Sequence, residues 1–426
     1  MDKTLKLQQR SIFQNKNFML LLIGQIVSNL GNAVHSVAVS WFIMETVGEG
    51  LSGTYMAIFG VSVLLPYIIF GPLSGVFVDR INRKKIIFGT DIIRGSLILI
   101  LGLLVYNNFY PMISLFAITF LGAIFGSFFN PAVDASMPNI VEEKDLTQAN
   151  SLNGISRSLT WIIGGAISGF LYYRLGIVGV FVVNGLSFVL SGISEMFINI
   201  PNVKKTKEES STTSFWLDFK DGLKYIRSQK TLMKIMVVAL FLNFLINPIF
   251  QIIFPKTIRF TLGMGAREYG IVNGLFPVGA MLGMILISTV AKFRDNIGVV
   301  NFGIVTESIL LAGFGIFLLP SILSVLGNMS VYFIFCGITV LLMICNSLIN
   351  IPLFTALQRK VPDELRGRFF GMFNTLTQGI VPVGLGLFGI LSDIVSPSTI
   401  YLGAGISSLL IGLWIVFTPD FKEIME

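Results

Sequence analysis

The chain has 426 residues and a formal net charge of +7, with 54% hydrophobic residues and only 12% charged residues. Soluble domains carry about 25% charged residues, and a water-soluble protein of this size could not bury so much apolar surface. The apolar residues occur in runs of about twenty, the length that crosses about 30 Å of hydrocarbon as a helix. The composition therefore excludes a soluble globular protein and predicts an all-α, multi-pass membrane protein.

Hydropathy along the chain predicts twelve membrane-spanning helices. They are expected at about 17–44, 52–78, 86–106, 110–132, 148–172, 177–199, 231–254, 269–291, 298–320, 328–352, 369–392 and 398–417. The polar residues 1–16 lead into a span that is too long for a signal peptide, and no small-residue cleavage site follows. We therefore expect an uncleaved N-terminal tail at 1–16.

Lysine and arginine predict the orientation, because cytoplasmic loops are enriched in them. With the N-terminus inside, the inner segments hold 24 of the 30 Lys and Arg residues. The outer loops hold four, which are Arg174, Lys256, Arg259 and Arg267. Both termini are therefore expected in the cytoplasm of a bacterial-type cell membrane. The positive charge is a topology signal that also attracts anionic lipid, so we expect no nucleic-acid partner.

The chain divides into two halves with matching features. The polar stretch 201–230 is predicted to be a cytoplasmic linker with an amphipathic helix, between six-helix bundles at 17–200 and 231–418 and before a tail at 419–426. At an offset of 214, Asn29 meets Asn243, and at an offset of 221, Pro131 meets Pro352. Two parallel repeats with a site at their interface are a transporter plan.

The loop after the second predicted span holds a glycine, a carboxylate and a basic cluster, from Gly75 through Asp79 and Arg80 to Arg83. Ordinary positive-inside charge is one explanation. The segment also resembles the G-x-x-x-D-R-x-G-R-K signature of the major facilitator superfamily, at the same position between helices two and three, with Asn82 in place of the usual Gly. The resemblance implies a fold of two pseudo-symmetric six-helix bundles. It also implies that Gly75, Asp79, Arg80 and Arg83 latch the two halves together on the cytoplasmic side in the outward-open state.

Further stretches resemble the macrolide-efflux branch of drug:proton antiporters. These are 130–153, the Asp91–Arg94 pair and 361–368. Siderophore exporters and lysophospholipid transporters share much of this pattern. Antiporters of the superfamily typically carry G-P-x-x-G-G in helix five, whereas Gly164, Gly165 and Gly169 occur here without the proline, so close helix packing is expected there.

Polar side chains repeat at helical spacing inside several spans, and such residues line water or face another helix. In the superfamily the first and seventh helices border the central cavity. The expected cavity residues are Gln25, Asn29, Asn32, Ser36, Trp41, Arg157, Trp161, Asn243, Asn247, Gln251, Asn346, Asn350, Asn374 and Gln378. The alternative is interhelical hydrogen bonding without a substrate role.

Ionisable residues inside a span are paired or functional, because a charge at mid-bilayer costs about 2.5–3.5 kcal/mol on insertion scales. Asp91 and Arg94 are expected to form a structural ion pair. Glu307 and His35 are assigned to proton coupling, since an apolar environment brings a carboxyl group toward titration near neutral pH and histidine titrates there. The alternative for both is a packing role.

These features predict a secondary exporter of an amphiphilic, drug-like or macrolide-like small molecule, working by proton-coupled antiport and alternating access. A siderophore or lysophospholipid carrier, and less so a nutrient symporter, are the rivals within transport. An enzyme is not expected, because the chain has one His and lacks a P-loop. We expect no metal and no cofactor, and the partners are the substrate, protons and membrane lipids, with no obligate protein partner. Cys336 and Cys345 are expected to be core residues.

Overall fold

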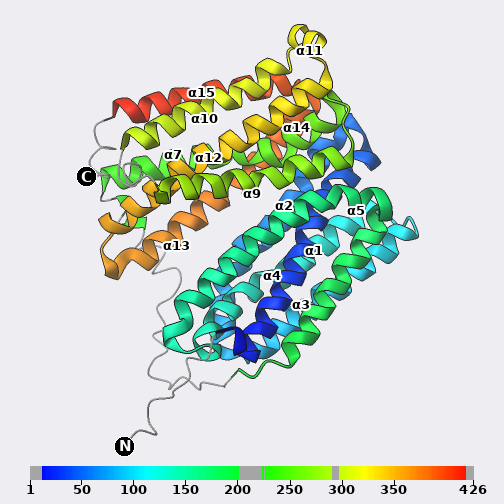
Figure 1. Cartoon of the computed structure of the whole chain (residues 1–426), viewed down its shortest axis with the longest axis vertical. Helices are drawn as coiled ribbons and strands as arrows, with labels where there is room; N and C mark the ends of the chain where they lie inside the picture. The colour runs from blue at the N-terminus through cyan, green and yellow to red at the C-terminus, as the bar shows by residue number, and fades with distance from the viewer. Residues whose placement is uncertain (1–11, 201–222, 225, 228, 290–296, 419–426) are drawn as a thin grey trace, which may run out of the picture.

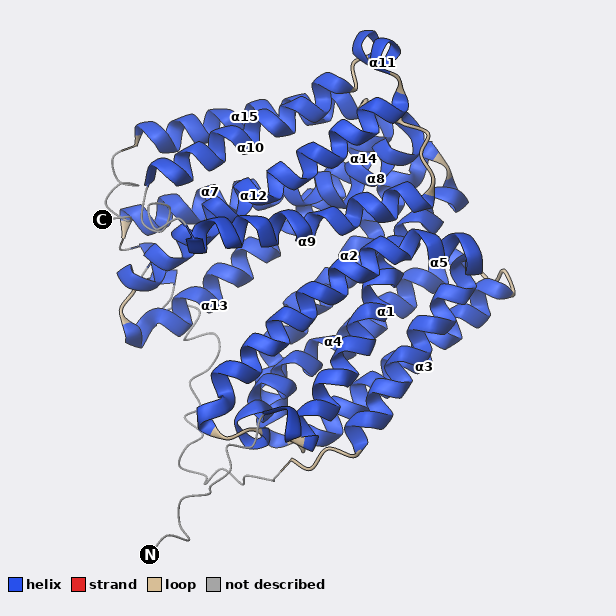
Figure 2. Ribbon diagram, viewed as in Figure 1, coloured by secondary structure: helices blue, strands red, loops and turns tan. Residues whose placement is uncertain are grey.

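The computed structural model describes residues 12–200, 223–289 and 297–418, except 225 and 228. Within these ranges every regular element is a helix (Figure 2). Most of the predicted tails at 1–16 and 419–426, and most of the linker at 201–230, lie outside the described residues. The side chains of Pro72, Val76, Asp79, Arg80 and Glu364 are also outside the description.

The first half of the chain forms one bundle (Figure 1). Its helices are α1 (Lys16–Val47), α2 (Glu49–Arg80), α3 (Arg83–Tyr106), α4 (Pro111–Ile140) and α5 (Leu146–Met196), with short 3₁₀ turns at Ile12–Gln14 and Glu143–Asp145. Helix α5 contains two crossings, because Gly176 has φ 64° and breaks the helical path.

The second half forms the other bundle (Figure 1). Its elements are α7 (Lys230–Pro248), the π-helical η3 (Ile249–Ile253), α8 (Phe254–Lys256), the π-helical η4 (Thr257–Thr261), α9 (Ala266–Thr289), α10 (Ile297–Phe317), α11 (Pro320–Leu326), α12 (Asn328–Lys360), α13 (Asp363–Gly379), α14 (Val381–Ile394) and α15 (Pro397–Phe417). The elements from α7 through η4 form one continuous helical stretch, and α13 with α14 form another. The π segments flank Pro255, which has no N–H for the regular helical pattern.

Local sequence signals set the ends of several helices. Asn15 caps α1 by accepting from the backbone N–H of Phe18 at 3.1 Å, and Asn82 caps α3 by accepting from Lys85. Asn82 stands where the signature has Gly. Its φ of −60° is not left-handed, so the backbone there does not require glycine, and the Asn side chain serves as the helix cap. Gly48, with φ 74°, ends α1.

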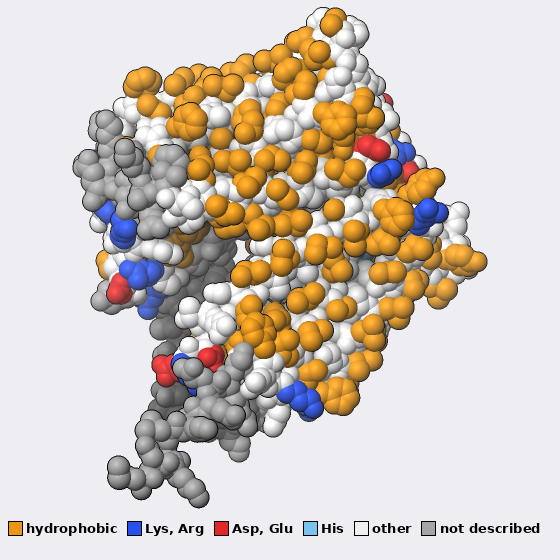
Figure 3. Space-filling view, viewed as in Figure 1, with side chains coloured by type: hydrophobic (Ala, Val, Ile, Leu, Met, Phe, Trp, Pro, Cys, Tyr) orange, Lys and Arg blue, Asp and Glu red, His pale blue; other side chains and the backbone are white. Residues whose placement is uncertain are grey.

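The twelve-helix prediction is confirmed. Eleven described stretches are long and apolar enough to cross a membrane, and the 54-residue stretch from Glu143 to Met196 supplies two crossings around Gly176. On the face shown in Figure 3, apolar side chains cover both bundles, while charged side chains lie toward the two ends. This distribution is that of a protein whose flanks contact lipid.

Among the described residues, the two bundles share a buried core at one end. One buried cluster contains residues of both halves, from Val34 and Phe181 to Phe254 and Tyr401. Two other clusters are confined to one half each, around Phe18 and around Phe369. We call the end with the shared core the closed end, and the end where α1 starts and α15 finishes the terminal end. The bundles diverge toward the terminal end (Figure 1).

Candidate functional site

Small residues bring α5 and α9 into backbone contact at the closed end. A Cβ atom on Gly169 would lie 2.0 Å from the carbonyl oxygen of Ala266, and one on Gly270 would lie 2.8 Å from the amide nitrogen of Gly169. Gly165 lies against Gly274 in the same way. The predicted close packing at the helix-five glycines is therefore made with the other half of the molecule.

Helices α2 and α14 make a second contact of this kind. A Cβ atom on Gly53 would lie 2.5 Å from the carbonyl oxygen of Gly389, and one on Gly389 would lie 2.5 Å from the Cβ of Ala57. Close backbone approach through small residues is a common way for membrane helices to associate, because it increases van der Waals contact without bulky side chains. The two contacts together join the bundles.

A polar cluster around Asp393 locks the α2–α14 contact. Its carboxylate accepts from the backbone N–H groups of Gly53 at 2.8 Å and Thr54 at 2.9 Å, and from the Thr54 hydroxyl at 2.7 Å. Lys256 pairs with Asp393 and also donates to the Ser392 carbonyl at 2.8 Å. The Asp393 carboxylate therefore ties the second turn of α2 to the end of α14 through charge-assisted hydrogen bonds.

A second polar cluster lies where α1 meets η4. Glu45 pairs with Arg259, with 3.4 Å between Oε1 and Nη1, and accepts from the indole N–H of Trp41 at 2.9 Å and from the Tyr172 hydroxyl. The Arg259 guanidinium also lies 4.6 Å from the centre of the Trp41 ring. This arrangement combines an ion pair with a cation–π contact across the two halves.

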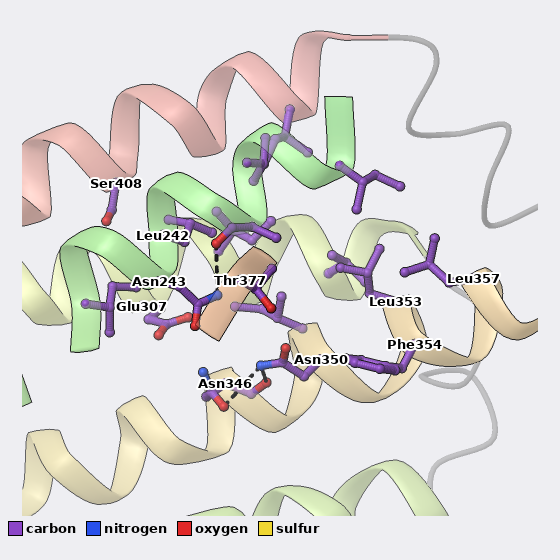
Figure 4. Close-up of a pocket in the computed structure, with 18 of the residues that line it drawn as sticks. Leu242, Asn243, Glu307, Asn346, Asn350, Leu353, Phe354, Leu357, Thr377 and Ser408 are labelled. Carbon is purple, nitrogen blue, oxygen red and sulfur yellow. Dashed lines mark hydrogen bonds between the residues drawn. The ribbon is translucent and has the colours of Figure 1, made fainter. Parts of the chain in front are cut away.

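The larger described cavity lies inside the second bundle and has a volume of about 390 Å³ (Figure 4). Its walls come from α7, α10, α12, α13 and α15, and most are apolar. The predicted cavity residues that line it are Asn243, Asn247, Asn346, Asn350, Asn374 and Gln378. The structure therefore brings together all but one of the predicted amides of the second half.

Glu307 on α10 lines the same cavity and is buried. Figure 4 shows it close to Asn243. The amides on either side are ordered by contacts within their own helices: Asn247 donates to the Asn243 side chain at 3.0 Å, and Asn350 donates to that of Asn346 at 3.1 Å. The cavity thus offers one carboxyl group, several amides and apolar walls, which together suit an amphiphilic ligand.

The first bundle contains a smaller polar cavity of about 80 Å³. The predicted residues Gln25, Asn29, Asn32 and Arg157 line it, together with Ser28, Tyr67, Arg94, Gly126, Phe129 and Asn130. Arg157 donates to the Asn130 side chain at 3.1 Å. The polar stripe of α1 therefore faces the interior of its own bundle.

Four predicted cavity residues line neither of these two cavities. Trp41 is buried in the Glu45 cluster and stacks on Tyr269, and Trp161 is 48% exposed. Gln251 is exposed on η3, and Ser36 lies on α1 between the smaller cavity and the closed end. Two of these residues contact the other bundle. Trp41 does so through Tyr269 of α9, and Gln251 lies near Gly60 of α2.

His35 lines neither cavity. Its ring lies against Phe181 with 5.3 Å between ring centres, and its buried Nδ1 atom has no hydrogen-bond partner. The predicted Asp91–Arg94 pair is present with 3.8 Å between the charged atoms. Arg94 also lies 4.2 Å over the ring of Phe188.

The proposed latch lies at the terminal end, where the bundles are apart. Arg83 donates to the carbonyl of Ala135 at 2.7 Å, within its own half. Gly75 has no atom within 4 Å of the position that a Cβ would take. The side chains of Asp79 and Arg80 are outside the description.

Reasoning from the sequence missed the residues that hold the closed end. Lys256 and Arg259 were counted only as outer positive charges, and Glu45 and Asp393 were given no role. Each lies near a helix end, where a charge needs no special explanation. Apart from Trp41, which lies four residues before Glu45, their partners are more than a hundred positions away, so spacing carried no signal.

Comparisons with known proteins agree with this architecture. Residues 21–385 match the model of the Major Facilitator Superfamily. Macrolide efflux protein A of Streptococcus pyogenes is 25% identical over 409 residues, which cover 96% of each chain. A mutant of the nucleoside transporter NupG has a TM-score of 0.71 at 12% identity, covering 96% of this chain and 100% of that one.

A bacterial homologue of the iron transporter ferroportin is similar in two states. The TM-score is 0.68 for its inward-facing state, at 15% identity with 95% and 99% of the two chains covered. It is 0.55 for its outward-facing state, at 14% identity with 94% and 99% covered. The family match spans most of the sequence, and the solved neighbours share the fold over nearly the whole chain. The protein is a multi-pass membrane protein that belongs to the major facilitator superfamily.

Proposed function

We propose that the protein is a secondary exporter that moves an amphiphilic small molecule out of the cytoplasm by proton-coupled antiport. The observation that carries the proposal is the asymmetry of the two ends: small-residue contacts and ion pairs join the bundles at one end, and the bundles separate at the other. Rocking of two repeats about such a contact exposes a site alternately to each side of the membrane.

The terminal end faces the cytoplasm in this proposal, as the excess of Lys and Arg in its loops predicts. The conformation is then inward-facing. The higher TM-score to the inward-facing state of the ferroportin homologue supports this assignment. A transporter in this state receives its substrate from the cytoplasm or the inner leaflet.

The substrate class follows from the larger cavity. Apolar walls provide the main binding energy for a lipophilic ligand, amides accept or donate hydrogen bonds, and the Glu307 carboxylate attracts a basic amine. The relationship to macrolide efflux protein A along 96% of both chains supports export of a compound of this kind. We propose macrolide-like or other amine-bearing amphiphiles.

Glu307 has a defined role in this scheme. A buried carboxyl group can hold either a proton or the positive charge of the substrate, and one excludes the other. Export of the substrate would then be exchanged for entry of a proton. Exchange of one proton for one singly charged amine moves no net charge, so the pH gradient drives it, at about 1.4 kcal/mol per pH unit.

Flux into proteoliposomes tests the proposal. We expect an imposed pH gradient to drive uphill movement of erythromycin or ethidium in wild-type protein, and Glu307→Gln to lose most of it because the neutral amide holds neither charge. Glu142→Gln is the matched control, since Glu142 is an exposed partner of Lys144. Wild-type activity in Glu307→Gln would contradict the role of Glu307. Selective movement of a lysophospholipid or a siderophore, with none of the amines, would replace the substrate class.

A further inference from the structure

A second buried acidic site lies in the first bundle, apart from the substrate cavity. Asp91 on α3 is 0% exposed and Glu195 near the end of α5 is 1% exposed, and the two carboxyl groups interact electrostatically. The Ser191 hydroxyl donates to Glu195 at 3.4 Å and lies near Asp91. The sequence prediction paired Asp91 with Arg94 and did not consider Glu195.

The site has more buried hydrogen-bond acceptors than donors to satisfy them. Both carboxylate oxygens of Asp91 and one of Glu195 are buried without a hydrogen-bond partner. Gln25 of α1 is 2% exposed, and both polar atoms of its side chain also lack a partner. Gln25 and Arg94 line the 80 Å³ cavity, which has room for water because one molecule occupies about 30 Å³ of liquid. Unpaired buried polar groups are costly, so this arrangement indicates a bound species.

Charge counting identifies that species. Two ionised carboxylates and the Arg94 guanidinium leave one net negative charge, and a single proton makes the set neutral. The guanidinium stays protonated in proteins and disfavours a metal cation beside it. The described residues also contain no group of three His, Cys, Asp or Glu side chains placed to hold a metal.

Other ionisable groups near the site do not supply the missing charge. Arg157 lines the same cavity, but its positive charge interacts with a carboxylate of its own, that of Asp134 on α4. His35 on α1 faces Arg94, and Tyr67 on α2 approaches Gly126 beside it. Neither of these two neighbours adds a fixed charge next to Asp91 and Glu195.

We propose that Asp91 and Glu195 share a proton-binding site with Arg94, and that this site, and not His35, couples the first bundle to the proton gradient. The inference rests on the proposed antiport and extends it. The site connects three helices: Gly24 of α1 packs against Ser191, where a Cβ would lie 2.9 Å from the hydroxyl. Binding or release of the proton changes the electrostatic interaction between α3 and α5, which both pack near α1. Helix α1 also carries Glu45 at the closed end.

Infrared difference spectroscopy of purified protein tests proton binding without transport. We expect a pH-dependent band of protonated carboxyl groups in the wild type, with a component that Asp91→Asn/Glu195→Gln removes and Glu307→Gln leaves in place. Asp91→Asn and Glu195→Gln alone keep the side-chain shapes, and gel filtration with thermal melting checks that each variant folds. A double variant with the full wild-type band would overturn the inference.

Transport in proteoliposomes gives the second readout. One coupled proton at an imposed gradient of about one pH unit supports about tenfold accumulation of ethidium. We expect the double variant to lose this accumulation and to keep ethidium exchange at equal pH. Undiminished accumulation, or accumulation driven by sodium instead, would refute the site. If wild-type protein moves neither ethidium nor erythromycin, the proposed function fails, while the infrared result still decides whether the proton site exists.

Discussion

The charged residues of this protein have roles that depend on what they face. Asp393 and Lys256 neutralise each other at the end of α14, and Glu45 and Arg259 do so beside an aromatic ring. Glu307 faces a cavity lined by amides. A charge in a low-dielectric environment is tolerated only with such partners, so each one marks a contact or a site.

Asp393→Asn is predicted to weaken the closed end. The amide keeps the size of the side chain but loses the ion pair with Lys256 and one acceptor for the Gly53 and Thr54 N–H groups, at a cost on the order of 2 kcal/mol. The equilibrium should then shift away from the described state. Spin labels at the exposed positions Gly50 and Ser324, one in each half, measure this as a longer distance by pulsed electron resonance.

Lys256→Met in the same labelled protein provides the comparison. It should shift the distances in the same direction, and the double variant should add little, since both changes remove one interaction. Additive effects of the two substitutions would mean that the ion pair does not hold the closed end.

At the scale of elements, glycines have two distinct uses. Gly176 turns the chain between the two crossings of α5, which requires its positive φ. Gly165 and Gly169 have ordinary helical geometry and are used because they lack a side chain, so that α9 can touch the α5 backbone. The helix-five glycine pattern predicted tight packing, but the partner helix was visible only in the structure.

Gly169→Ala is predicted to disrupt the α5–α9 contact. The new Cβ would lie 2.0 Å from a backbone carbonyl oxygen, which cannot rotate away. We expect about 1–3 kcal/mol of overpacking, seen as a lower melting temperature and reduced substrate exchange.

Gly154→Ala on the same helix is the matched control, because no atom lies within 4 Å of its Cβ position. It should be neutral or stabilise the helix by about 0.5–1 kcal/mol. Equal effects of the two substitutions would show that helix propensity, and not the contact with α9, determines the result.

For the whole molecule, the two ends have different roles, and the orientation in the membrane decides which side each end faces. The terminal end carries the positively charged loops, and the closed end carries paired charges. If the terminal end is cytoplasmic, the described state admits substrate from inside. The direction in which the protein opens is therefore tied to the distribution of Lys and Arg.

Cysteine labelling tests this orientation in intact cells. In a background with Cys336→Ala and Cys345→Ala, we expect a cysteine at Asn108, between α3 and α4, to react with a membrane-impermeant maleimide. A cysteine at Lys144, between α4 and α5, should react only after permeabilisation. The reverse pattern would invert the topology and turn the described state into an outward-facing one.

The sequence alone determined the helical membrane fold, its twelve crossings and the amides that line the cavities. These depend on local quantities, which are apolar run length, the 3.6-residue period and loop charge. Asn243 and Asn346 could be assigned to one cavity because helical spacing places polar residues on one face.

Only the tertiary structure decided how the two halves meet. The contacts between different helices in the Asp393 and Glu45 clusters join residues 127 to 340 positions apart, and the Asp91–Glu195 site joins residues about one hundred positions apart. No periodicity links such residues, because their separation in space is set by helix packing. Trp41 shows the difference: its type suggested a substrate pocket, while its neighbours place it in the closed end.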